Sequence, residues 1–103
     1  MKKIIDGKRY DTETATRLAD IQRGQQSSFD YFEEALYRTA KGAYFLAGFG
    51  HASSKYAVAC GDGSYGAGHG LSALTEDAAY EWAERYLDAD QVESLFGNRI
   101  QDA

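Results

Sequence analysis

A run of twenty residues near the middle of the chain, DYFEEALYRTAKGAYFLAGF (30–49), constrains the fold more than any other segment. Both of its halves are rich in aromatic and large aliphatic residues, which suit the pleated surface of a β-sheet. Between them, Ala40, Lys41 and Gly42 form a short break, and Gly42 can adopt the left-handed backbone conformation of a tight loop. The segment therefore predicts a β-hairpin.

Shorter segments before this hairpin predict further strands. Residues 2–5 and 8–10 flank Asp6-Gly7, a dipeptide typical of the type I′ turn that joins two antiparallel strands. Residues 15–23 (ATRLADIQR) fit either a helix or a short strand, because their two apolar residues are spaced three apart and the segment is brief. We favour the strand.

The segment after the hairpin predicts two more strands around a glycine-rich stretch. Residues 55–60 are expected to form a strand with Tyr56, Val58 and Cys60 on one face, so that Cys60 serves as a small buried hydrophobic residue. Residues 71–74 are expected to form a short closing strand.

The C-terminal third carries the strongest helical pattern. Thr75 is a good N-cap, Glu76 and Asp77 favour the positive end of the helix dipole, and an apolar stripe follows at Ala79, Trp82, Ala83 and Tyr86. The helix is predicted to end at residues 88–90, and a second short helix is predicted over residues 91–96. The sequence therefore predicts one α+β domain, residues 1–103, with a small antiparallel sheet of about four to five strands under a C-terminal helix and a short helix.

The overall composition argues against a membrane protein and against a secreted one. No apolar run approaches the roughly 18 residues of a membrane span, and the first residues lack the apolar centre of a signal peptide. The single cysteine, Cys60, cannot form an internal disulfide, whereas small secreted domains usually carry several. We therefore expect a cytoplasmic protein without a membrane partner.

The glycine-rich stretch CGDGSYGAGHG (60–70) contains a formal match to the dinucleotide-binding pattern G-x-G-x-x-G. That pattern binds a nucleotide only where it follows a strand, opens a helix and is followed by a parallel strand. Residues 67–74 are poor helix formers, and the remaining residues are helical, so no second strand completes the unit. We interpret residues 61–70 as a turn-forming or flexible stretch whose glycines let the backbone turn or approach a neighbour, and we predict no cofactor.

Other candidate sites are weak as well. His51, Cys60, Asp62 and His69 offer metal-ligand atoms, but they lack the paired short spacing of structural zinc sites. Cys60 with either histidine is the only conceivable nucleophilic pair. Glu33 and Glu34, as neighbours on a strand, point to opposite faces and cannot act together. We therefore predict no metal, no catalytic residues and no small-molecule substrate.

Charge is distributed unevenly along the chain. The net charge is −5; residues 1–74 hold nine Lys/Arg and eight Asp/Glu, whereas residues 75–103 hold two and eight. Direct binding of DNA or RNA requires a basic face, so an acidic segment favours a basic protein partner. Four of these acids share one face of the predicted helix and would span roughly 16 Å at a rise of about 1.5 Å per residue: Asp77, Glu81, Glu84 and Asp88.

Three segments together resemble a family of small proteins of phages and bacterial mobile elements, which includes anti-CRISPR proteins that block type I, and in particular type I-C, CRISPR–Cas complexes. These segments are KKIIDGKRYDTETA (2–15), FEEALYRTAKGAYFLAGFG (32–50) with SKYA (54–57), and LTEDAAYEWAERYLDADQVESLFG (74–97). The resemblance implies a non-enzymatic inhibitor that binds the effector complex and blocks target DNA recognition. Acidic residues would occupy the Lys/Arg-lined groove into which DNA enters, as a partial DNA mimic.

The family supplies no binding residues that can be transferred position by position, so the candidates come from charge alone. The first group lies on the predicted helices: Glu76, Asp77, Glu81, Glu84, Asp88 and Asp90. The second lies on the hairpin: Asp30, Glu33 and Glu34. Two other classes stay open, namely a small structural or regulatory module that could be homodimeric and an enzyme that uses Cys60 and a histidine.

Overall fold

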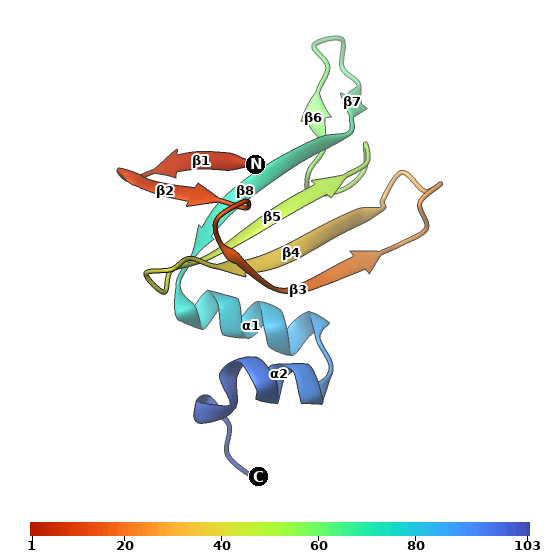
Figure 1. Ribbon diagram of the computed structural model, residues 1–103. Coiled ribbons are helices and arrows are strands. Elements are labelled where there is room, and N and C mark those ends of the chain that lie inside the picture. The colour runs from red at the N-terminus through yellow and green to blue at the C-terminus, as the bar shows by residue number, and fades with distance from the viewer.

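The computed structural model describes all residues 1–103 and confirms the α+β fold (Figure 1). A four-stranded antiparallel sheet lies at the centre, with the strand order β3-β4-β5-β8. Two small hairpins lie at its periphery, and both helices lie below it in Figure 1. The strands of the central sheet are β3 (Thr16–Arg23), β4 (Phe32–Arg38), β5 (Tyr44–Gly50) and β8 (Gly68–Leu74).

The predicted N-terminal hairpin is present as β1 (Lys2–Ile5) and β2 (Lys8–Asp11). Asp6 and Gly7 both have positive φ angles, 52° and 75°, as a type I′ turn requires. The hairpin covers part of one face of the central sheet, where Tyr10 meets Phe45 edge to face at 5.5 Å between ring centroids.

The central hairpin and the favoured strand over residues 15–23 are also confirmed. β4 pairs with β5 in a register that places Leu36 opposite Leu46, and β3 pairs with β4 along its length. β3 contains a register shift between Arg17 and Ala19. Because a bulge inserts an extra residue, Leu18 and Ala19 both pack against the core on the helical side of the sheet.

Both predicted helices are present. α1 (Glu76–Tyr86) begins at Thr75, whose hydroxyl oxygen accepts a hydrogen bond from the Ala78 N–H at 3.0 Å. α2 (Ala89–Phe96) is followed by a short 3₁₀ turn, η1 (Gly97–Arg99). Neither helix has the length and apolar content that crossing a lipid bilayer requires.

The junction between the helices differs from the prediction. Asp88 does not continue α1, because Leu87 has an extended backbone conformation and ends that helix. Asp88 instead caps α2: its carboxylate accepts from the Gln91 N–H at 2.8 Å, and the Gln91 side chain accepts from the Asp88 N–H. This capping box starts α2 two residues earlier than predicted.

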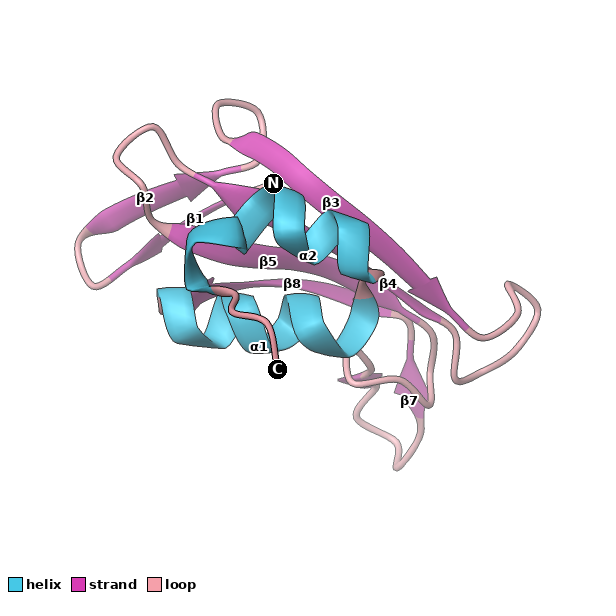
Figure 2. Cartoon of the chain, turned by 90° about the horizontal axis from the view of Figure 1, so that it is seen from below, coloured by secondary structure: helices cyan, strands magenta, loops and turns pink.

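The core lies in two layers, one on each face of the sheet. The larger cluster lies between the sheet and the helices, which Figure 2 shows side by side across one face. It contains Ile21, Leu36, Tyr44, Ala79, Trp82, Ala83, Val92 and Phe96. The smaller cluster lies on the opposite face under the β1–β2 hairpin and contains Tyr10, Phe45 and Leu71.

The segment between β5 and β8 holds the main corrections. Only Val58–Ala59 (β6) forms a strand in the predicted 55–60 region, paired with Tyr65–Gly66 (β7) in a separate hairpin. Tyr56 lies in a turn instead, and Cys60 is exposed, so its predicted buried role is wrong.

The glycines of residues 61–70 serve two purposes: some let the backbone turn, and one lets it pass close to a neighbouring segment. Gly61 and Gly63 have φ angles of 86° and 87° within the bend between β6 and β7. No helix opens there, because β8 begins at Gly68 and is three residues longer than the predicted closing strand. Gly68 is needed for a close contact: a Cβ atom there would lie 2.3 Å from the Tyr56 carbonyl oxygen.

Candidate functional site

Exposed carboxylates gather on the two helices and the turn between them. We call this set the acidic helical surface; it comprises Glu76, Asp77, Glu81, Glu84, Asp88, Asp90 and Glu93, all exposed. At about 100° of rotation per residue, Asp77, Glu81 and Glu84 lie opposite the buried side of α1. Because α1 docks on the sheet through Ala79, Trp82 and Ala83, these carboxylates face solvent.

Arg99 neutralises one end of the acidic helical surface. Its guanidinium lies 2.9 Å from the Asp77 carboxylate and 3.5 Å from that of Glu76. The remaining acids take part in no salt bridge: Glu81, Glu84, Asp88, Asp90 and Glu93. The uncompensated charge is therefore centred on the second half of α1 and the start of α2.

The three hairpin acids do not join this surface. Asp30 is exposed in the loop before β4. Glu33 lies on the sheet face away from the helices and accepts a hydrogen bond from the Tyr31 hydroxyl at 2.6 Å. Glu34 points the other way and is only 3% exposed, so its carboxylate is not on the surface of the free protein, contrary to what its charge predicted.

Glu34 is instead the centre of a buried polar cluster beneath α1. Its carboxylate accepts hydrogen bonds from the Tyr56 hydroxyl at 2.5 Å and from the Trp82 indole N–H at 3.0 Å. The Lys55 ammonium completes the set at 3.0 Å. The cluster joins β4, the turn after β5 and α1, three elements that are remote in sequence.

The protonation states in this cluster follow from its geometry. Burial alone would raise the pKa of Glu34, but the hydrogen bonds from Tyr56, Trp82 and Lys55, together with the ammonium charge, hold it below its ordinary value of 4.5. Burial and the neighbouring Glu34 carboxylate raise the pKa of Tyr56 well above its ordinary range. Glu34 is therefore an anion and Tyr56 a neutral donor at neutral pH.

Glycine residues in the sheet make room for Tyr56. A Cβ atom on Gly48 would lie 2.1 Å from the Tyr56 ring carbon that bears the hydroxyl, and Gly70 lies in ordinary contact with the same ring. Gly48 pairs with Gly70 across β5 and β8. The Tyr56 ring therefore lies in a shallow trough over these two glycines, and the missing side chain of Gly48 is what lets the Tyr56 hydroxyl reach Glu34.

The potential metal ligands and nucleophiles stay apart. The His51 ring nitrogen Nδ1 is hydrogen-bonded to the Ser28 carbonyl at 2.9 Å, and Asp62 accepts from the N–H and hydroxyl of Ser64. His69 and Cys60 are exposed. No group of three or more His, Cys, Asp or Glu side chains is arranged to hold a metal ion.

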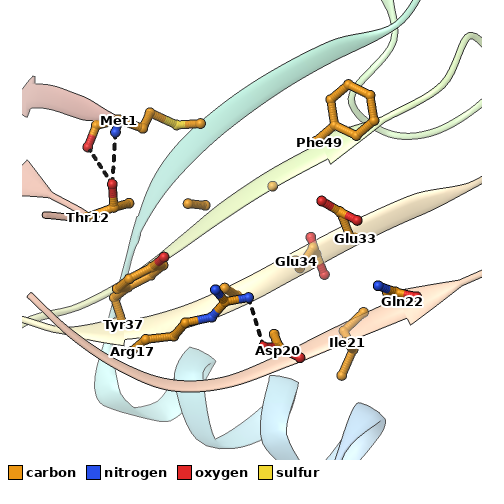
Figure 3. A pocket seen from close by; sticks show the side chains of 13 residues that line it. Met1, Thr12, Arg17, Asp20, Ile21, Gln22, Glu33, Glu34, Tyr37 and Phe49 are labelled. Atoms are coloured by element: carbon orange, nitrogen blue, oxygen red, sulfur yellow. Dashed lines mark hydrogen bonds and ion pairs between the residues drawn. The ribbon is translucent and has the colours of Figure 1, made fainter.

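A hollow of about 360 Å³ opens on the sheet face away from the helices (Figure 3). Tyr37 and Phe49 rise from β4 and β5 beside it, and Met1 and Thr12 border it. Its charged groups already have partners, since Arg17 lies 2.7 Å from Asp20. Every buried side-chain nitrogen and oxygen atom of the protein has a hydrogen-bond partner, so no unpartnered buried group points into the hollow.

No protein-family model matches the chain, and no match is found among curated proteins or solved structures. The candidate site therefore depends on its own geometry. The sequence contained one signal for the buried cluster that the charge pattern obscured. On β4, Glu34 alternates in phase with Phe32 and Leu36, so a core position for Leu36 places Glu34 on the same inward face.

Proposed function

We propose that this protein is a non-enzymatic inhibitor of the anti-CRISPR type, which acts in the bacterial cytoplasm. Its acidic helical surface would bind the basic DNA-binding surface of a type I CRISPR–Cas effector protein and block target DNA recognition. The observation that carries this proposal is the set of five exposed carboxylates without a salt-bridge partner on α1, α2 and the turn between them. The resemblance of the sequence to the anti-CRISPR group supports the choice of partner.

Electrostatics favours this mode of action. A groove that binds duplex DNA is lined by Lys and Arg, and an acidic ligand is steered toward it and complements it on contact. The carboxylates are held by helices that dock on the sheet through Trp82, Ala83 and Phe96. Little backbone conformational entropy is therefore lost when the surface binds a partner.

Charge reversal at Glu81 and Glu84 is expected to abolish protection of phage in bacteria that carry a sensitive type I system. Neither residue forms a salt bridge, so the domain should stay folded. Coupling energies of close interfacial charge pairs start near about 1.5 kcal/mol, and about 1.4 kcal/mol is tenfold in affinity. We expect Glu81→Lys with Glu84→Lys to weaken binding about 100-fold or more, measured by phage plating and by pull-down of the complex.

A matched control keeps the same net charge. Glu13→Lys with Asp30→Lys also changes the net charge from −5 to −1, but alters exposed acids away from the helices. This variant should protect phage as well as the unmodified protein does. Equal loss of protection by both double variants would show that only net charge matters and would contradict a defined acidic surface.

One feature favours the alternative of a small structural or regulatory module that forms homodimers. β3 lies at the edge of the central sheet, with β4 as its only neighbour. An exposed edge strand can pair with a second copy of the chain. A stable dimer in light scattering, combined with no binding to any CRISPR–Cas complex, would support this alternative.

A further inference from the structure

The Lys55 side chain occupies a site whose chemistry suits any alkylammonium group. Its ammonium nitrogen lies 3.0 Å from the Glu34 carboxylate, 4.6 Å from the centre of the Phe32 ring and 5.7 Å from that of Tyr86. A carboxylate together with aromatic ring faces is the arrangement by which proteins recognise ammonium ions. We call Glu34, Phe32 and Tyr86 the ammonium cage.

The residues of the ammonium cage are fixed by further contacts within the fold, whereas the Lys55 side chain is half exposed. Glu34 is held by hydrogen bonds from Trp82 and Tyr56, and Phe32 contacts Tyr86 edge to face at 6.5 Å. Lys55 comes from a turn, and its side chain is 47% exposed, against 2% for that of Glu34. The buried carboxylate accepts from Trp82 and Tyr56 independently of the half-exposed Lys55 ammonium, which is its only cationic partner.

The cage lies beside a groove that leads to the acidic helical surface. The groove has a volume of about 660 Å³, within the range of small-ligand sites. Trp82, Tyr86 and Lys55 line it together with Leu46 and Leu74, and Glu81 and Glu84 also belong to its lining. Arg85 is the other cation that lines the groove; its guanidinium lies over the Tyr86 ring at 6.0 Å from the ring centre, and that of Arg23 at 5.2 Å.

We propose that the ammonium cage is a binding site for a lysine side chain of a partner protein, which Lys55 occupies in the free protein. A basic partner attracted by Glu81 and Glu84 would insert its lysine along the groove and displace Lys55 from Glu34. The identity of the partner rests on the proposed function, but the ligand chemistry of the cage does not.

The test uses the full chain with Lys55→Ala and n-butylammonium as the probe, at constant ionic strength. Lys55→Ala should lower the melting temperature, because Glu34 loses its cation. At about five times its Kd, n-butylammonium should raise that temperature by about 4 °C or more. It should also shift the indole N–H resonance of Trp82, the only tryptophan. The uncharged n-butanol should do neither.

Lys55→Ala combined with Glu34→Gln is the matched control and should not respond to n-butylammonium. Should Lys55→Ala alone fail to fold, folding induced by n-butylammonium and not by n-butanol is the expected result. An absent response, or an equal response with Glu34→Gln, overturns the cage. Because these measurements involve no partner, they can fail while charge reversal at Glu81 and Glu84 still abolishes inhibition, and the converse also holds.

Discussion

Replacing Glu34 with alanine is expected to lower the free energy of unfolding by about 3–5 kcal/mol, because each of the two donors that lose their acceptor costs about 1–3 kcal/mol and the half-exposed Lys55 loses its ion pair. The substitution leaves the Trp82 indole N–H, the Tyr56 hydroxyl and the Lys55 ammonium without their acceptor. At roughly 4 °C or more per kcal/mol for a domain of this size, the melting temperature should fall by about 12 °C or more. Thermal and urea unfolding monitored by Trp82 fluorescence measure the effect.

Glu33→Ala is the matched control for this experiment. The change is chemically identical and lies on the same strand, but Glu33 accepts only the Tyr31 hydroxyl and lies on the opposite face. Its cost should be about 1 kcal/mol. Equal losses at both positions would mean that the Glu34 cluster does not hold α1 and the Tyr56 turn to the sheet.

The same cluster should make stability depend on pH. Because the folded state holds the pKa of Glu34 below its ordinary value of 4.5, the unfolded chain takes up the proton more readily. The contribution of Glu34 is therefore complete above about pH 5 and is lost as the pH falls through the folded pKa. The difference in unfolding free energy between the unmodified protein and Glu34→Gln should shrink only below pH 4.5.

Gly48→Ala is expected to destabilise the protein by about 3 kcal/mol or more, because the cost of overpacking adds to the cost of losing a hydrogen bond to a charged group. The new Cβ atom would lie 2.1 Å from both the hydroxyl oxygen and the adjacent ring carbon of Tyr56. Tyr56 must leave the trough and release Glu34. Urea unfolding gives the free-energy change.

Two comparisons isolate the cause of this effect. Gly97→Ala adds the same atom where nothing lies within 4 Å and φ is −56°, so stability should stay within about 0.5 kcal/mol. In a Tyr56→Ala background, Gly48→Ala should cost much less than in the unmodified protein. An undiminished cost in that background would place the strain elsewhere in the sheet.

Local patterns predicted the elements that depend on local chemistry. Asp6-Gly7 predicted a turn, Gly42 predicted a loop, and Thr75 predicted the start of α1. Each of these features depends on backbone conformations or hydrogen bonds within a few residues. The apolar stripe through Ala79 and Trp82 predicted which face of α1 is buried. These features depend little on contacts with residues far away in the sequence.

Features that depend on remote contacts could not be predicted in this way. The β-favouring side chain of Tyr56 predicts a strand, but its ring docks on Gly48 of β5 and Gly70 of β8, a contact that no local pattern indicates. The glycines at the start of β8 carry little strand propensity and so do not predict a strand, although a side chain at Gly68 would collide with the Tyr56 carbonyl oxygen. The charge of Glu34 likewise predicts an exposed side chain. Its burial depends on three donors that the local sequence does not reveal.

The proposed function requires that the acidic helical surface and target DNA compete for one basic cleft. The most direct test is a titration of labelled target duplex onto the effector complex, with increasing amounts of the protein and at two salt concentrations. Competition predicts that the protein raises the apparent Kd for DNA. The effect should weaken at 1 M salt, where charges are screened beyond about 3 Å. A ternary complex in which DNA binds with unchanged affinity would contradict it.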